Sequence, residues 1–227
     1  MKSANYQRLL AIDPSLTSTG WALFVLREQK PSAVGLLVPP GPRMSLAERF
    51  DALQAMVESL FSEFTFGASD ILLCEGPAPL VLNPQSALKV EGVRGIFEAV
   101  ARSRGMLVPG RLNPRTIQGE LLGMRGRQLD RKQVKSWARE VAKRLYGAQL
   151  RKLTNKEYRH VPQDIIDASL IGSLAVSRVQ LAIRYGADLQ SAFLPRYKTN
   201  RRGSGGKSSS RRWAAWSETE YRQLIAK

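Results

Sequence analysis

The sequence predicts an α/β fold, in which a mixed five-stranded sheet is flanked by helices and followed by a basic, largely disordered tail. Short apolar runs bounded by Gly and Pro, typical of buried strands, alternate with segments whose apolar residues recur every three or four positions, typical of helices. Their order is three strands, a helix, a strand, a helix, a strand and then helices. With 227 residues, the chain is long enough for one sizeable domain and an appendage.

The first two predicted strands form a hairpin. An apolar run at residues 9–12 delivers Asp13 and stops at Pro14, and a Ser/Thr-rich turn leads to a second apolar run at 20–26. A carboxylate at the end of a buried strand costs free energy unless something positive neutralises it. Asp13 is therefore a candidate metal ligand.

The middle of the chain contains a second carboxylate in the same kind of position. The continuous apolar run at 70–74 is typical of a strand covered on both faces, and it ends in Glu75 before a Gly-Pro break. The other expected elements are a strand at 33–38, a helix that begins at Leu46 after a Ser45/Glu48 capping box and ends near Gly67, a helix at 85–103, a strand at 106–112 and a short helix after Asn113.

The C-terminal third predicts two long helices, at 131–146 and 165–185, separated by a polar linker at 149–161. Asp164 and Asp167 are three residues apart at the start of the second helix, so both carboxylates face the same side. We expect one domain over residues 1–195. The segment 196–227 has nine Lys or Arg against two Glu, and we expect a basic tail that ends in a short helix.

Composition restricts the possible partners. The formal net charge of +16 makes nucleic acid the leading partner, because its phosphates are attracted to so much positive charge. A single cysteine, Cys74, excludes an intramolecular disulfide and a cysteine-cluster zinc site. No window approaches the roughly 18–20 apolar residues of a membrane span, so we expect a cytoplasmic, nucleoid-associated protein without a membrane partner.

The four carboxylates Asp13, Glu75, Asp164 and Asp167 together predict a metal-dependent nuclease. Carboxylate oxygens suit Mg²⁺, with Mn²⁺ able to replace it. Two such ions about 3.5–4 Å apart can activate water and stabilise both oxygens of a phosphoryl displacement. The order of elements is that of the ribonuclease H-like fold, whose adjacent first and fourth strands would bring Asp13 and Glu75 together.

Four segments, taken together, resemble the RuvC-type Holliday junction resolvases. AIDPSLTSTGWAL is similar to their first motif, LLCEGP to their second, SALKVEGVRG to the helix that follows, and HVPQDIIDASLIG to their last motif. The resemblance covers about residues 7–180, in the family's order. It implies that the four acids are catalytic and metal-binding, and that a homodimer nicks two opposing strands of a four-way DNA junction symmetrically.

The chain departs from this family at three points. Ala78 stands where an aromatic residue often wedges the junction open, which makes Leu80, Val81 and Leu82 the wedge candidates. Gln118 replaces an expected lysine, whereas Lys132 matches a basic residue used at the scissile phosphate. The long tail suggests a phage or divergent member, so we do not expect a branch-migration motor as a partner. The candidate phosphate contacts are Lys89, Arg94, Arg115, Arg125, Arg127, Arg131 and Lys132.

The sequence is also compatible with other functions. A relative of broader specificity would cut flaps, forks or RNA–DNA hybrids, and a non-catalytic relative would only bind junctions. A sugar-kinase or actin-like nucleotide site has a similar first hairpin, but its second phosphate hairpin and its adenosine motif are missing. His160 is either a general base or a structural linker residue.

Overall fold

The computed structural model describes residues 6–77, 84–124 and 130–193. A five-stranded sheet with strand order β3-β2-β1-β4-β5 forms the middle layer. The first three strands are an antiparallel meander, and β4 and β5 run parallel to β1. The mixed sheet confirms the predicted fold class. The strands are β1 (Arg8–Asp13), β2 (Thr19–Val25), β3 (Lys30–Leu37), β4 (Asp70–Glu75) and β5 (Arg111–Leu112).

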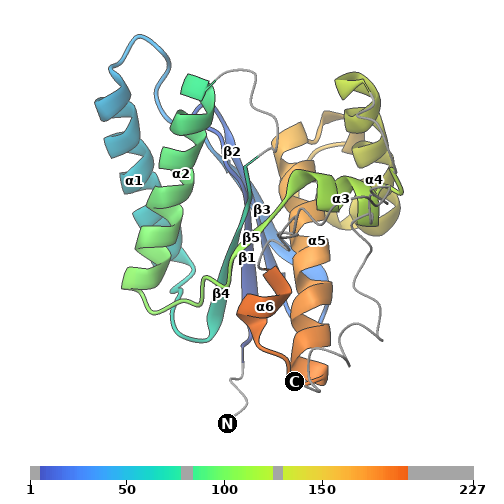
Figure 1. Ribbon diagram of the computed structural model, residues 1–227. Coiled ribbons are helices and arrows are strands. Elements are labelled where there is room, and N and C mark those ends of the chain that lie inside the picture. Colours follow the sequence, from blue (N-terminus) through green and yellow to red (C-terminus); the bar gives the residue numbers. More distant parts are fainter. Residues whose placement is uncertain (1–5, 78–83, 125–129, 194–227) are drawn as a thin grey trace, which may run out of the picture.

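Helices cover both faces of the sheet. α1 and α2 lie on one face, and α5 lies on the other with α3 and α4 beside it (Figure 1). The predicted capping box at Ser45 and Glu48 is present at the start of α1. The helices are α1 (Leu46–Glu63), α2 (Pro84–Ser103), α3 (Pro114–Glu120), α4 (Arg131–Thr154), the 3₁₀ turn η1 (Tyr158–His160), α5 (Gln163–Arg184) and α6 (Leu189–Phe193).

The central strand β1 is buried on both faces, which explains its unbroken apolar sequence. Leu9 and Ala11 belong to the core between the sheet and α5, whereas Leu10 and Ile12 belong to the core under α1 and α2. Because side chains alternate along a strand, Asp13 continues the Leu9–Ala11 side and points toward the α5 layer.

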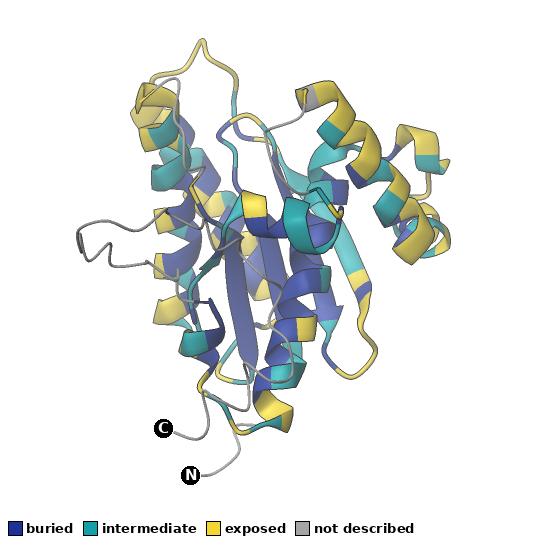
Figure 2. Cartoon of the chain, turned by 45° about the vertical axis from the view of Figure 1, so that its right-hand side comes forward, coloured by how far each residue is buried: buried dark blue, intermediate teal, exposed yellow. Residues whose placement is uncertain are grey.

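Helix α5 is the core helix of that second layer. By length and composition it could cross a membrane, which shows that the expectation of no such segment was wrong, but 72% of its apolar window is buried inside the protein. Figure 2 shows α5 and the sheet as the buried centre of the molecule, with the outer turns of α4 exposed. Its apolar sequence is therefore accounted for by packing against β1 and β2.

Two elements differ from the sequence prediction. The strand expected at 106–112 is reduced to β5 and an isolated bridge at Leu107, because Gly110 has a φ of +153° that interrupts an extended strand. Helix α4 continues to Thr154 instead of ending at residue 146, since Leu150 is fully buried and extends the apolar face. The expected tail at 196–227, with its terminal helix, lies outside the described residues and stays a prediction.

Candidate active site

The carboxyl ends of β1 and β4 place two of the predicted acids side by side. The strands are parallel neighbours, with Ile12 opposite Cys74, so the next residues along are Asp13 and Glu75. Glu75 continues the side of β4 that carries Leu73, which packs in the same core as Ala11. Both carboxylates therefore point toward α5 at the same edge of the sheet.

The first turn of α5 brings the other two acids to this edge. Gly20 pairs with Asp13 across the β1–β2 hairpin. A Cβ added to Gly20 would overlap the main-chain carbonyl of Asp164 and would lie 3.0 Å from the Asp164 Cβ. The helix thus begins directly against the strand opposite Asp13, and only glycine leaves room for this approach. Asp167 lies one turn further along the same helix.

The electrostatics of the site show that the acids share one environment. Burial raises the pKa of Asp13 well above its ordinary value, and the charges of Glu75, Asp167 and Asp164 raise it further. Burial, together with the charge of Asp167, raises the pKa of Glu75 to about 7. Burial also raises the pKa of Asp167 to about 6, with a contribution from Asp164. The prediction that these residues converge on a single acidic site is therefore supported by their mutual repulsion.

Residues that the sequence analysis did not single out hold Asp167 in place. Gln163 Nε2 donates a hydrogen bond to Asp167 Oδ1 at 2.8 Å, and Gln163 Oε1 accepts one from Arg139 at 3.3 Å. The positive charges of Lys135 and Arg139 lower the pKa of Asp167 and partly offset its burial. In the sequence, only the spacing of cations along the 131–146 segment could have indicated Lys135 and Arg139.

Arg94 corrects one of the predicted phosphate contacts. Its side chain is only 6% exposed, and it is hydrogen-bonded to the main-chain carbonyls of Glu75 (2.6 Å) and Gly76 (3.1 Å) and to Glu91 (2.9 Å). A guanidinium used in this way is not available to a DNA backbone. Instead, it fixes the end of β4 from beneath, and its charge lowers the pKa of Asp13 and of Glu75.

The side chains at this edge are of the chemical type that hard divalent cations bind. Four carboxylates meet at one edge, and the buried cation beside them, Arg94, is already bonded to the backbone. Within residues 6–77, 84–124 and 130–193, no group of three or more acidic, His or Cys side chains is placed so that it could hold a metal ion. Hard ions with oxygen ligands relieve repulsion of this kind.

The remaining predicted residues divide into two groups. Lys89, Arg115 and Lys132 are exposed, as a phosphate contact requires, and His160 is exposed at the end of η1. The other predicted positions cannot be placed: Arg131 begins α4 but its side chain is outside the description, and Arg125, Arg127 and the wedge candidates Leu80, Val81 and Leu82 lie outside the described residues.

Comparisons with known proteins identify the fold. No protein-family model and no curated protein matches the chain. The structure of Thermus thermophilus RuvC matches with a TM-score of 0.56 at 18% identity, over 79% of this chain and 97% of that one. T. thermophilus RuvC in complex with a Holliday junction substrate matches with a TM-score of 0.54 at 18% identity, over 77% and 96% of the two chains.

A third similar structure comes from a eukaryote. The yeast mitochondrial Holliday junction resolvase Ydc2 matches with a TM-score of 0.50 at 15% identity, over 84% of this chain and 85% of that one. Likeness at such low identity concerns architecture, since sheet order and helix placement persist after sequences diverge. The chain has the fold of the RuvC-type Holliday junction resolvases.

Proposed function

We propose that this protein is a metal-dependent endonuclease that resolves four-way DNA junctions by nicking two strands symmetrically. The observation that carries the proposal is the convergence of Asp13, Glu75, Asp164 and Asp167 at one edge of the sheet, where the charges of the other three raise the pKa of Asp13. The shared fold with two resolvases supports the choice of a junction as the substrate.

The residues of the site have distinct roles in this proposal. The four carboxylates would hold two Mg²⁺ ions, with Mn²⁺ able to replace them. Bound there, the ions would supply the positive charge that activates water and stabilises the leaving oxygen of the phosphodiester. Gln163 orients Asp167 through its 2.8 Å hydrogen bond, and Lys135 offsets part of the negative charge. Lys132, exposed on the first turn of α4, is placed to meet the phosphate backbone.

Symmetric nicking requires two copies of the site, so we also propose a homodimer that acts on chromosomal or phage DNA in the cytoplasm. Helix α2 offers a contact surface, because Leu88 is 72% exposed. A hollow of about 470 Å³ on the same helix is lined by Gly92, Gly95 and Ile96, among others, and by Gln54 and Glu58 of α1.

A panel of synthetic DNA substrates tests the function. The purified full chain is incubated with Mg²⁺ and a four-way junction, a flap, a replication fork, a linear duplex and an RNA–DNA hybrid of matched sequence. We expect paired nicks at symmetric positions of the junction and at least tenfold slower cutting of the others. Equal cutting of flaps, forks and junctions would replace resolution by a broader branched-DNA activity. Junction binding without any cutting, in Mg²⁺ and in Mn²⁺, would contradict the nuclease.

A further inference from the structure

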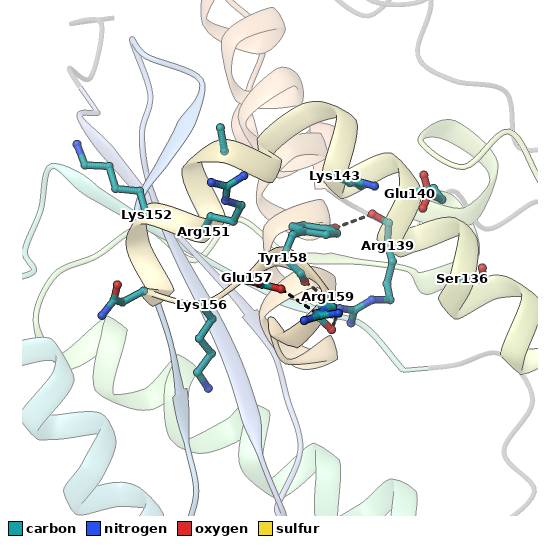
Figure 3. A pocket seen from close by; sticks show the side chains of 12 residues that line it. Ser136, Arg139, Glu140, Lys143, Arg151, Lys152, Lys156, Glu157, Tyr158 and Arg159 are labelled. Atoms are coloured by element: carbon teal, nitrogen blue, oxygen red, sulfur yellow. Dashed lines mark hydrogen bonds and ion pairs between the residues drawn. The ribbon is translucent and has the colours of Figure 1, made fainter.

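A second concave surface lies beside the candidate active site and is not used by the chemistry proposed above. It is a hollow of about 930 Å³ formed by the exposed side of α4, from Ser136 to Asn155, and by the segment 156–159 that leads into η1. Figure 3 shows its side chains projecting from the two arms of this turn. The hollow exists because α4 continues to Thr154 and the chain then returns along it.

Hydrogen bonds fix the shape of the hollow. The Tyr158 hydroxyl donates to the main-chain carbonyl of Arg139 at 2.6 Å, and the Arg139 guanidinium donates to the carbonyls of Tyr158 and Val161, both at 3.1 Å. The same guanidinium lies 5.8 Å from the centre of the Tyr158 ring. These contacts join η1 to the middle of α4, so the shape of the hollow is fixed by hydrogen bonds between the two elements.

The hollow is strongly basic. Two carboxylates lie in its lining, and one of them, Glu157, is paired with Arg159 at 2.8 Å. Lys143, Lys152 and Lys156 are exposed and have no hydrogen bond or ion pair within the described part of the chain, as is also true of Arg151. Holding so many like charges together costs free energy, which a bound polyanion would recover. The six cations of the lining are Arg139, Lys143, Arg151, Lys152, Lys156 and Arg159.

A chain of two side chains connects this hollow to the acids. Arg139, which lines the hollow, donates to Gln163 at 3.3 Å, and Gln163 donates to Asp167 at 2.8 Å. The hollow and the acids are therefore neighbours, close enough for one extended polyanion to contact both. This nearness favours a nucleic acid over a separate acidic peptide, because the backbone of the proposed substrate already passes the acids.

We propose that the α4–η1 hollow binds the sugar-phosphate backbone of a duplex arm of the DNA substrate, and so holds that arm while the acids act on the strand beside it. This inference rests on the proposed function. The cations contact phosphates and not base edges, so the contribution to binding is independent of sequence and falls with salt concentration.

Charge neutralisation tests the proposal. The double variant Lys143→Gln/Lys152→Gln, here called the hollow variant, is compared with the control Arg102→Gln/Arg184→Gln, which removes the same charge. Arg102 lies in α2 and Arg184 is the last residue of α5. Figure 1 shows α2 on the other side of the sheet from α4. Binding of a four-way junction is measured in EDTA over a range of salt concentrations, after circular dichroism has shown that both variants fold. We expect the hollow variant to bind about tenfold more weakly, with a salt slope smaller by roughly 1 to 2, and the control to change less than twofold.

The outcomes separate this inference from the nuclease assignment. Equal effects of the two double variants would overturn the inference, even if the wild-type protein cuts junctions as proposed. Wild-type binding with the predicted salt dependence but no cleavage would contradict the nuclease while the hollow stands. A wild-type protein that binds no branched DNA would contradict both.

Site-specific crosslinking locates the contact. Cys74, the one cysteine of the chain, is buried and its burial raises the pKa of its thiol, so an introduced surface thiol can be labelled selectively. Lys156→Cys with an attached photo-crosslinker is expected to form adducts in the arm of the junction. Arg184→Cys with the same label is expected to form none. Adducts at both positions, or at neither, would overturn the proposal.

Discussion

At the scale of single residues, the site depends on the close packing of the start of α5 against β2 as much as on the charges of the acids. The sequence singled out Asp13, Glu75, Asp164 and Asp167, because strand ends and the first turn of a helix can be recognised from the sequence pattern; their role as one metal site stays a prediction. It gave no sign that Gly20 leaves room for the start of α5, since the space is taken by a main chain more than a hundred residues away. It also misassigned Arg94, because burial is not visible in a basic residue on a predicted helix.

The Gly20→Ala substitution tests the role of close approach. The added methyl group would overlap the Asp164 carbonyl, so α5 must shift away from Asp13. We expect a loss of cleavage of about tenfold to a hundredfold, since metal sites tolerate little displacement of their ligands, and a loss of stability of about 1–3 kcal/mol. Nicking rates and urea unfolding provide the two readouts. Gly41→Ala is the control, because a Cβ there meets nothing within 4 Å; identical behaviour of the two variants would refute the packing argument.

At the scale of elements, α4 is longer than the sequence pattern predicted. The polar residues from 149 onward suggested a linker, but Leu150 continues the apolar face four residues beyond Tyr146, and Asn155 ends the helix in the left-handed conformation with a φ of 50°. Both signals were present in the sequence. Propensity also favours a helix here, because Ala148, Gln149, Leu150, Arg151 and Lys152 are strong helix formers. The linker prediction gave the polarity of the segment too much weight.

The meeting of β1, β4 and α5 also predicts how stability depends on pH. With the pKa of Glu75 near 7 and that of Asp167 near 6, the metal-free folded protein holds protons that the unfolded chain has already released. The free energy of unfolding therefore falls as the pH rises from about 4 to about 7. We expect the metal-free thermal midpoint to drop by on the order of 5–10 °C over this window.

Divalent metal should remove this dependence. Millimolar Mg²⁺ or Mn²⁺ is expected to raise the thermal midpoint at pH 8 and to have little effect at pH 5, where Glu75 and Asp167 are mostly protonated. Glu75→Gln removes one of the repelling charges, so its metal-free midpoint should depend less on pH. A wild-type midpoint that climbs with pH in EDTA would contradict the account of the acidic edge.

At the scale of the whole molecule, the chain joins a small acidic edge to a strongly positive remainder. The formal net charge of +16 attracts a polyanion in general, whereas the four carboxylates specify where hydrolysis would occur. The overall charge and the order of elements were both available from the sequence. The basic hollow was not, since it arises from the return of η1 along α4.

The proposed homodimer is testable at the same scale. Light scattering of the wild-type protein is expected to give twice the 25.3 kDa mass of the chain. Leu88→Glu places a charge on the exposed face of α2 and is expected to shift the protein toward monomer, whereas Val38→Glu, at a side chain 55% exposed on another surface, should leave the mass unchanged. A monomeric wild-type protein at micromolar concentration would exclude the dimer.

The central claim, that the four acids form one metal-dependent cutting site, is tested most directly by single-turnover nicking of a four-way junction with Asp13→Asn. The control is Asp51→Asn, which changes an exposed carboxylate of α1. Residues that only support metal ligands contribute about 10–100-fold, so loss of a ligand should slow nicking more than a hundredfold while junction binding in EDTA is unchanged. Asp13→Asn that cuts at the rate of Asp51→Asn would contradict the account.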